Sequence, residues 1–263
     1  GVGMKLTKEQ DYAIRIVYEL FKTNSKMTVA EVSEKTGVTP LCHLTCVQST
    51  REHVQHVLAD MKTAGMENVL ALRGDLPKEG EPCHDFAYAA ELIDFIHQQG
   101  DFCVGAACYP EGHPESGSRA KDMDYLRRKV DAGVDFLTTQ MFFDNGLLYN
   151  FLYRMQRAGM DIPVCAGIMP ICDARQVARV VKLSGSIMPP RFAAIADRFA
   201  GDPQAMTQAG IAFATEQIVD LVANGVGHIH LYTMNKPWIA RAIVENLSSI
   251  IKLEAGKDAT SAN

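Results

Sequence analysis

The feature that most constrains the fold is a regular alternation, beginning at Cys42, between short apolar runs and longer stretches with helical spacing. The short runs are rich in β-branched residues and end in polar or glycine-containing turns. Such alternation is typical of βαβ units and a parallel sheet. The expected strands are His43–Gln48, Asn68–Asp75, Phe102–Tyr109, Phe136–Phe143, Pro163–Met169 and His228–Met234, with Ser186–Met188 as a further, very short strand.

Amphipathic stretches separate these runs, and several end at a glycine, which readily adopts the left-handed conformation that closes a helix. The glycines are Gly65, Gly100, Gly133, Gly159 and Gly225. The expected helices are Thr50–Ala64, Asp85–Gln98, Arg119–Ala132, Gly146–Ala158, Asp173–Leu183, Arg191–Ala200, Gln204–Asn224 and Trp238–Ile251.

The chain length of 263 residues suits one (β/α)8 barrel, but only six or seven of the eight strands are readable. The front of the chain does not supply the rest, because Thr7–Lys22 and Thr28–Lys35 both have the pattern of helices. We therefore predict an α/β protein with a TIM-type (β/α)8 barrel whose first two strands are missing or replaced by an N-terminal helical segment. The predicted organisation is a helical segment at 1–41, the barrel at 42–253 and a flexible tail at 254–263.

Composition narrows the class of protein. Hydrophobic residues make up 47% and charged residues 22% of the chain, as in ordinary globular proteins. The net charge of −5 argues against a general nucleic-acid or membrane surface. No apolar run approaches the roughly 18 residues of a membrane span, and no secretory signal opens the chain, so a cytoplasmic location is expected. The seven cysteines include no C-x-x-C pair, so neither disulfides nor a metal site is expected.

Polar and aromatic residues gather where the expected strands end. In a parallel barrel these positions meet at one rim, where active sites lie. The strand ends in question are Leu72–Pro77, Tyr109–Glu115, Thr139–Asp144, Gly167–Pro170 and Leu231–Lys236. The pattern therefore predicts a single site at this rim.

The residue types at this rim suit a flat conjugated cofactor with a phosphate tail. Aromatic rings that can stack on such a group are Tyr109, Phe142 and Tyr232. Groups that could meet a pyrophosphate are Arg73, His113, Arg128 and Lys129. Hydrogen-bonding groups for the edge of a heterocycle are Asp75 and Gln140. Neither a G-x-G-x-x-G nor a P-loop motif is present, so a Rossmann or P-loop phosphate site is not indicated.

Each of these residues also has a purely structural interpretation. Arg73 and Asp75 could form an ion pair at a strand end, and His43 could be a buried core histidine. Arg128 and Lys129 could belong to a solvated helix face. The residues alone therefore indicate a barrel enzyme acting on a phosphorylated or aromatic ligand, and go no further.

Taken together, seven motifs resemble the methylenetetrahydrofolate reductase family in order and spacing. The resemblance runs from about Thr28 or Thr39 to Ile251. The motifs are His43–Cys46, Leu72–Pro77, Tyr109–Glu115, Lys129–Gly133, Thr139–Asp144, Gly167–Pro170 and Tyr232–Asn235.

The resemblance implies an FAD-containing barrel that uses NADH or NADPH to reduce 5,10-methylenetetrahydrofolate to 5-methyltetrahydrofolate, in one-carbon metabolism and methionine biosynthesis. Asp75 would be the catalytic residue, stabilising the cationic iminium form of the folate. The residues that the resemblance implies as FAD ligands are His43, Arg73, Gly74, Asp75, Tyr88, Ala89, Tyr109, His113, Asp122, Arg128 and Lys129. Those implied as substrate ligands are Gln140, Gln176, Tyr232 and Lys236, the last standing where bacterial relatives often have arginine.

Two motifs of the family are absent from this sequence. One is the F-E-F-F-P of the first strand, whose glutamate is the general acid, and the other is the S-V-T-Y-G-A of the second strand. Proton transfer from a placed acid contributes roughly 10²–10⁴ in rate. A flavin- or folate-binding protein without turnover is therefore an alternative to the reductase.

The front of the chain has a resemblance of its own. Residues Met4–Arg15 resemble the start of a winged-helix family of bacterial redox-responsive repressors. The recognition helix and wing of that family are absent, so DNA binding is not expected. A regulatory protein that acts through its N-terminal helices is a further alternative. We also expect self-association, because the open edges of an incomplete barrel need cover from these helices or from a partner subunit.

Overall fold

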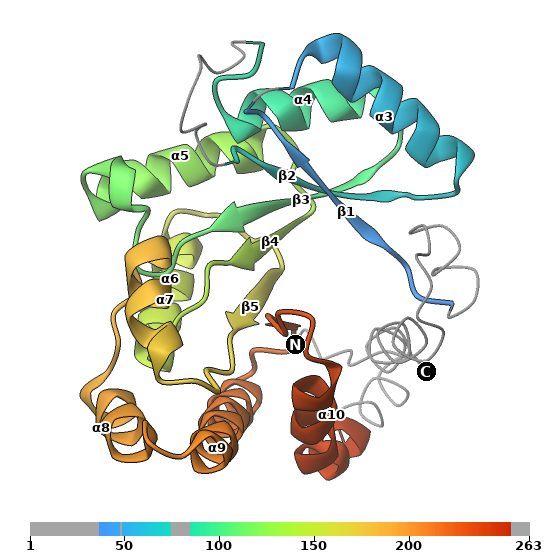
Figure 1. Ribbon diagram of the computed structural model, residues 1–263. Coiled ribbons are helices and arrows are strands. Elements are labelled where there is room, and N and C mark those ends of the chain that lie inside the picture. Colours follow the sequence, from blue (N-terminus) through green and yellow to red (C-terminus); the bar gives the residue numbers. More distant parts are fainter. Residues whose placement is uncertain (1–36, 48, 75–84, 254–263) are drawn as a thin grey trace.

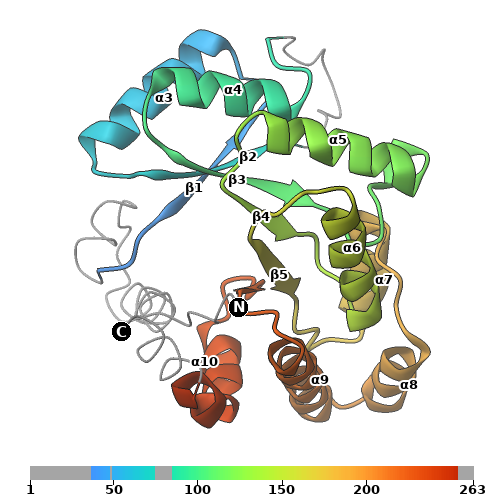
Figure 2. The same ribbon diagram turned by 180° about the vertical axis from the view of Figure 1, so that it is seen from behind.

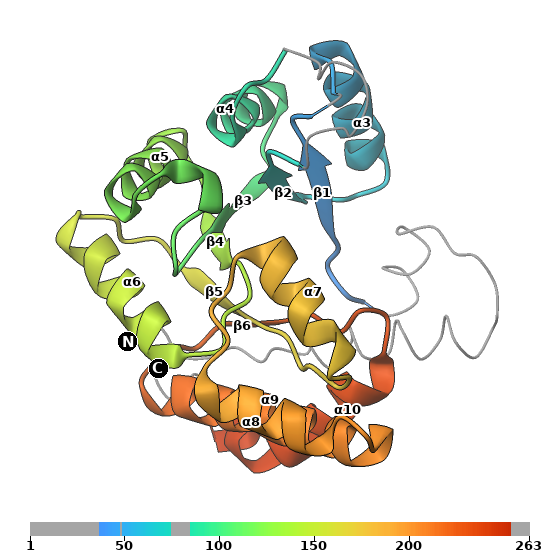
Figure 3. The same ribbon diagram turned by 60° about the vertical axis from the view of Figure 1, so that its left-hand side comes forward.

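The computed structural model describes residues 37–47, 49–74 and 85–253 (Figure 1). These residues form one parallel sheet of six strands, which follow one another in chain order and curl around a common axis (Figure 3). The strands are β1 (Leu41–Thr45), β2 (Asn68–Leu72), β3 (Cys103–Cys108), β4 (Phe136–Thr139), β5 (Val164–Ile168) and β6 (Ile229–Leu231). The structure is therefore consistent with part of a TIM-type barrel, and among the described strands no pairing joins β1 to β6.

Helices follow the strands and cover the outer side of the curled sheet (Figures 1 and 2). Several begin at side-chain caps, as where the Thr50 hydroxyl accepts from the His53 amide and the Ser118 hydroxyl from the Lys121 amide. The helices are α3 (Arg51–Thr63), α4 (Ala89–Gln99), the 3₁₀ turn η1 (Pro114–Ser116), α5 (Arg119–Asp131), α6 (Asn145–Arg157), α7 (Arg175–Ser184), α8 (Pro190–Phe199), α9 (Pro203–Ala223) and α10 (Pro237–Asn246).

Alternate strand residues face opposite sides of the sheet, and the two sides differ in chemistry. The helix-facing side forms the main hydrophobic core with α3, α4, α6, α9 and α10 and includes Val69, Val104, Leu137 and Ile168. The inner side carries the row His43, Leu70, Gly105 and Phe136, which share one register. A methyl group on Gly105 would overlap the Phe136 ring, so this glycine allows the ring to lie across the inner side.

Two sequence predictions need correction. The helix expected from Asp85 begins only at Ala89: the Asp85 carboxylate accepts from the Arg51 amide (2.8 Å) at the start of α3, and residues 85–88 form an irregular, bent segment. The very short strand expected at Ser186–Met188 does not form. Its first residue instead donates from Ser186 Oγ to the Met141 carbonyl (2.7 Å), so the segment is held by side-chain bonds rather than by a sheet.

The six main strands are confirmed, although each is shorter than its apolar run, and β4 ends at Thr139 rather than Phe143. The predictions for residues 1–36, for Asp75 and for the tail at 254–263 lie outside the described residues. Among the residues described, no helix has the length and apolar character needed to cross a membrane.

Helix α9 packs unusually close to the loop after β5, and Gly210 makes this possible. A Cβ atom at Gly210 would lie 2.0 Å from the carbonyl oxygen of Ile171, which belongs to the backbone and cannot rotate away. The helix would have to move outward to accommodate any side chain there.

We predict that Gly210→Ala destabilises the fold by about 1–3 kcal/mol, the range for overpacking, even though alanine favours helix more than glycine does. Gly201→Ala is the matched control, since its Cβ would have no atom within 4 Å. Urea unfolding of both variants measures the effect. Equal unfolding midpoints for the two variants would contradict the predicted close contact.

Candidate active site at the carboxyl ends of the strands

A connected cluster of polar and aromatic side chains lies beyond the end of β3. The Tyr109 and His113 rings meet edge to face with centroids 4.6 Å apart. His113 Nδ1 accepts from the Glu115 amide (3.1 Å) and so caps η1, while the His113 backbone N–H donates to the buried Asp122 carboxylate on α5. Burial raises the pKa of Asp122, and the hydrogen bond from His113 opposes that rise.

Lys129 extends from α5 into this cluster. Its ammonium donates to the carbonyl of Ala107 (2.7 Å) and lies 5.8 Å from the centre of the Tyr109 ring. Burial lowers the pKa of Lys129, against the favourable charge of Asp122. The interpretation of Lys129 as part of a solvated helix face is therefore wrong.

Arg73 follows β2 and is held by Glu115, whose carboxylate accepts from both terminal guanidinium nitrogens. Arg73 holds the pKa of Glu115 below its usual value, mainly through this hydrogen bonding. The structural interpretation of Arg73 was an ion pair with Asp75. That interpretation stays untested, because Asp75 lies outside the described residues. The contact with Glu115, which lies 42 positions from Arg73 in the chain, was not predicted from the sequence.

A second group of side chains lies where α4 begins and α5 passes. Tyr88 is the N-cap of α4, directly before Ala89, and its ring is stacked with Tyr125 of α5. The Arg128 guanidinium lies 5.5 Å from the centre of the Tyr125 ring. Arg128 is exposed, so its cation is available at the surface of α5 beside the aromatic pair.

The end of β6 forms another wall of the rim. The Tyr232 hydroxyl donates to the Thr139 carbonyl (2.9 Å), which ties β6 to the end of β4. A Cβ atom at Gly167 would lie 2.7 Å from the Tyr232 ring, so the ring depends on glycine at that position. Burial raises the pKa of Tyr232 to about 12, with Tyr109 among the smaller causes, so the ends of β3 and β6 influence one another.

Histidines lie on the inner side of both edge strands. The His230 ring meets Tyr232 edge to face at 4.6 Å. Burial lowers the pKa of His230, and the charge of His43 on β1 lowers it further. His43 is exposed, so the interpretation of His43 as a buried core residue is wrong. Among the described residues, no group of three or more potential metal ligands comes together.

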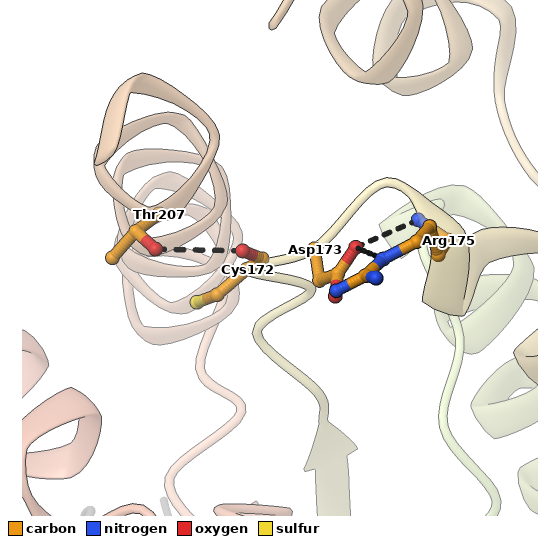
Figure 4. A network of polar contacts seen from close by, with 4 residues as sticks. All are labelled: Cys172, Asp173, Arg175 and Thr207. Atoms are coloured by element: carbon orange, nitrogen blue, oxygen red, sulfur yellow. Dashed lines mark hydrogen bonds and ion pairs between the residues drawn. The ribbon is translucent and has the colours of Figure 1, made fainter. Parts of the chain in front are cut away.

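The predicted substrate residues lie on separate parts of the rim. Gln140 follows β4, and its side-chain oxygen accepts from the Met141 amide (3.0 Å). Gln176 lies in the first turn of α7. Figure 4 shows the loop that precedes this helix, in which Asp173 forms an ion pair with Arg175 and the Cys172 carbonyl accepts from the Thr207 hydroxyl.

Lys236 precedes α10 and acts electrostatically on this loop. Its charge contributes to lowering the pKa of Asp173, although Arg175 is the larger cause. The turn before Lys236 is conformationally unusual, because Met234 and Asn235 both have left-handed backbone angles (φ +50° and +58°). Residues held in this region cost about 1–3 kcal/mol and cluster at functional sites.

The geometry thus connects Arg73, Tyr109, His113, Asp122 and Lys129 in one cluster and Tyr88 with Arg128 in a second. The direct contacts described above do not join Gln176 or Lys236 to either cluster. Three further residues make contacts that the sequence analysis did not predict: Glu115 with Arg73, Tyr125 with Tyr88, and His230 with Tyr232.

We predict that acidification weakens the fold partly through His230. A histidine whose folded-state pKa lies below the unfolded value of about 6.5 binds fewer protons in the folded state than in the unfolded state. Its contribution to the free energy of unfolding is therefore fully present above that pH and is lost as the pH falls. His230→Gln should therefore reduce the slope of unfolding free energy against pH between about 7.5 and 5.5, by at most about 1.4 kcal/mol per pH unit.

Urea unfolding at several pH values gives these slopes, and His56→Gln on the exposed side of α3 is the control. A slope for His230→Gln equal to that of the unchanged protein would show that the imidazole is not held neutral by its surroundings.

Comparison with solved structures supports the fold. An uncharacterized protein from Clostridium thermocellum, solved with two copies of 5-methyl-5,6,7,8-tetrahydrofolic acid, superposes with a TM-score of 0.58 over 94% of this chain and 93% of its own. The two share only 10% sequence identity, so the likeness concerns the fold alone.

Sequence comparison identifies closer relatives. The 5,10-methylenetetrahydrofolate reductases of Pectobacterium carotovorum and Salmonella typhimurium are each 32% identical to this chain, covering 83% and 82% of it and 73% and 72% of their own lengths. Methylenetetrahydrofolate reductase 2 of Saccharomyces cerevisiae is 35% identical over 84% of this chain, which spans 38% of that longer protein. The family model of methylenetetrahydrofolate reductase matches residues 16–248. The chain belongs to the methylenetetrahydrofolate reductase family.

Proposed function

We propose that this protein reduces 5,10-methylenetetrahydrofolate to 5-methyltetrahydrofolate, with FAD as its resident cofactor and NADH or NADPH as the electron donor. The observation that carries the proposal is the cluster of Arg73, Tyr109, His113, Asp122 and Lys129. Three elements, β2, β3 and α5, bring these motif residues together at the rim where barrel enzymes place their chemistry.

The side chains of the two clusters have the chemistry needed to bind a flavin dinucleotide. Cationic and imidazole groups suit a pyrophosphate, and the exposed rings of the second group suit a flat heterocycle. Gly74 supports the fit, because its φ of +83° favours glycine and a Cβ there would lie 3.0 Å from Cβ of Thr45. The backbone after β2 therefore stays bare, as close approach of a ligand requires.

Within this proposal, Arg73 and Lys129 hold the pyrophosphate, and His113 and Asp122 keep the loop after β3 in place. Bound FAD would supply the group that accepts a hydride from the nicotinamide and passes it to the folate. Tyr232 forms a fixed wall, since its hydroxyl is bonded to the Thr139 carbonyl.

The substrate side of the proposal rests on four further residues, Gln140, Gln176, Lys236 and Asp75. Gln140 uses its side-chain oxygen on the Met141 amide, which leaves its amide NH₂ as the donor it can offer a substrate. Gln176 and Lys236 would contact the folate or the nicotinamide. We assign to Asp75 the stabilisation of the iminium cation.

A second candidate function is binding of flavin and folate without reduction of the folate. The sequence observation that favours it is the absence of an F-E-F-F-P motif from residues 1–263. The two functions differ in one step, the proton transfer that accompanies opening of the folate ring.

The first experiment is an FAD titration followed by the visible spectrum, and then the two half-reactions measured separately. The reductase should bind FAD, bleach it with NADH or NADPH, and reoxidise it with 5,10-methylenetetrahydrofolate. Bleaching with reoxidation slower by roughly 10²–10⁴ than in a relative carrying the glutamate would favour the second candidate. Absence of FAD binding would contradict both.

We predict that Lys129→Met weakens FAD binding by roughly 10- to 100-fold, because hydrogen bonds to charged groups contribute about 1.5–3 kcal/mol. Methionine preserves most of the apolar stem, so the fold should persist. Lys121→Met, on the exposed side of the same helix, is the control and should bind FAD normally. Flavin fluorescence gives both affinities, and equal values would remove Lys129 from the site.

Self-association, a cytoplasmic location and a role for residues 1–41 in covering the open sheet edges are further parts of this proposal. They rest on the family resemblance and on the edge strands β1 and β6. Sedimentation velocity of the full chain, alone and with FAD, tests the first of them.

A further inference from the structure

The segment from the end of α7 to the start of α8 contacts two of the loops that carry proposed site residues, although it contains none of those residues. We call residues 184–188 the bridging segment. Its two serines, Ser184 and Ser186, are both buried. Buried hydroxyl groups need hydrogen-bond partners, and the partners found here lie in the loops after β3 and β4.

The first contact of the bridging segment is with the loop after β3. The backbone N–H of Ile187 donates to Oε2 of Glu111 (2.8 Å). Glu111 lies between Tyr109 and His113, whose rings meet in the cluster described above. The bridging segment is therefore attached to the loop that carries these two rings.

The Glu111 carboxylate has only part of its hydrogen-bonding capacity satisfied. Its second oxygen, Oε1, is buried, and among the described residues no group donates to it. Burial raises the pKa of Glu111, while the Ile187 N–H and the charge of Arg119 oppose that rise. Buried polar atoms normally have partners, and exceptions gather at functional sites. Stability of the fold alone therefore does not explain why a carboxylate stands at this position.

The second contact of the bridging segment is with the loop after β4. Ser186 Oγ donates to the Met141 carbonyl (2.7 Å), and the Ser186 N–H donates to Ser184 Oγ (3.1 Å). The Met141 amide in turn donates to Oε1 of Gln140 (3.0 Å). Met141 is thus held at its carbonyl by Ser186, and it holds Gln140 with its N–H.

The direction of the Gln140 side chain depends on where Met141 is placed. The backbone N–H of Gln140 donates to the Cys108 carbonyl (2.8 Å), so the sheet fixes the backbone at this point. The side chain is free to rotate except for its bond to Met141. A displacement of about 1 Å in a group that contacts a substrate can cost roughly 10²-fold in rate, so this bond matters for chemistry.

We propose that Glu111 and Ser186 are positioning residues for Gln140 and act through the bridging segment. Glu111 fixes the backbone of the segment at Ile187, and Ser186 passes this constraint to the carbonyl of Met141. The inference rests on the proposed function, in which Gln140 offers its amide NH₂ to the substrate. It makes the loop after β3, on the cofactor side, a support for a group that meets the folate.

The first test measures the affinity of the full chain with bound FAD for 5-methyltetrahydrofolate. Ser186→Ala should weaken this affinity by roughly 3- to 10-fold, the effect of losing one hydrogen bond. In a Gln140→Ala background the same change should have no further effect, because Ser186 acts through Gln140. A purely structural role of Ser186 would weaken the affinity equally in both backgrounds.

Further variants separate the contact from its surroundings. Glu111→Ala should weaken folate binding, whereas Glu111→Gln keeps an oxygen that can accept from Ile187 and should retain most of the affinity. Thr215→Ala is the control for Ser186→Ala, because it removes another partly buried hydroxyl, which donates to the Ile211 carbonyl (2.8 Å). Both Thr215→Ala and Ser186→Ala should bind FAD as tightly as the unchanged protein.

A second measurement reports the position of Gln140 without any ligand. The NMR signal of the Gln140 side-chain NH₂ group is identified by its loss in Gln140→Ala. This signal should shift in Ser186→Ala and in Glu111→Ala, and it should stay in place in Thr215→Ala.

An unshifted NMR signal in Ser186→Ala would overturn the proposal and leave the proposed function intact. Equal losses of folate affinity in the two backgrounds, or no loss in either, would overturn it as well. If the unchanged protein binds no folate, the proposed function fails, and the NMR signal alone decides whether Glu111 and Ser186 position Gln140.

Discussion

Hydrogen bonding between neighbouring parallel strands sets the level at which each strand ends, and every part of the candidate site depends on that level. Thr45 is paired with Leu72, and Cys108 with Thr139, so the residues that follow these four emerge on one rim. A shift of one residue in this register would turn each inner side chain outward. His43, Gly105 and Gly167 would then face the helices, and the core residues would face the inner side.

Buried charge is the second requirement of the site. The Lys129 ammonium and the Asp122 carboxylate both lie in surroundings that disfavour their charged forms. A backbone group stabilises the charged form of each side chain. The Ala107 carbonyl accepts from the lysine, and the His113 N–H donates to the aspartate. An uncompensated buried charge is costly, so these backbone bonds make the cluster possible.

The sequence was sufficient to predict the order of strands and helices, because apolar periodicity is a local property and the turns carry glycine. It failed where a distant side chain overrides the local pattern. Asp85 is a residue type that often caps a helix, yet its carboxylate accepts from the Arg51 amide and α4 begins only at Ala89. Ser186–Met188 has the apolar character of a strand, but side-chain bonds to Met141 and Ser184 hold it instead.

The candidate site was predictable to a similar degree. Motif residues such as Lys129 and Tyr109 are connected in space, whereas the contact of Arg73 with Glu115 links positions too far apart for any local pattern to show. Tyr125 belongs to no motif, and its pairing with Tyr88 depends on how α4 and α5 pack. The assignment of Asp75 stays a prediction.

The contact between Gly167 and Tyr232 has a consequence for how this protein can be altered. The Tyr232 ring fills the space that any side chain at position 167 would need, and the Thr139 carbonyl closes the other direction at 2.5 Å. Because that carbonyl belongs to the backbone, a smaller residue at position 232 would not make room for a side chain at position 167, and glycine is required there. Efforts to reshape this wall for a different ligand must therefore keep Gly167 and vary the ring at position 232, where a smaller side chain widens the site without a backbone clash.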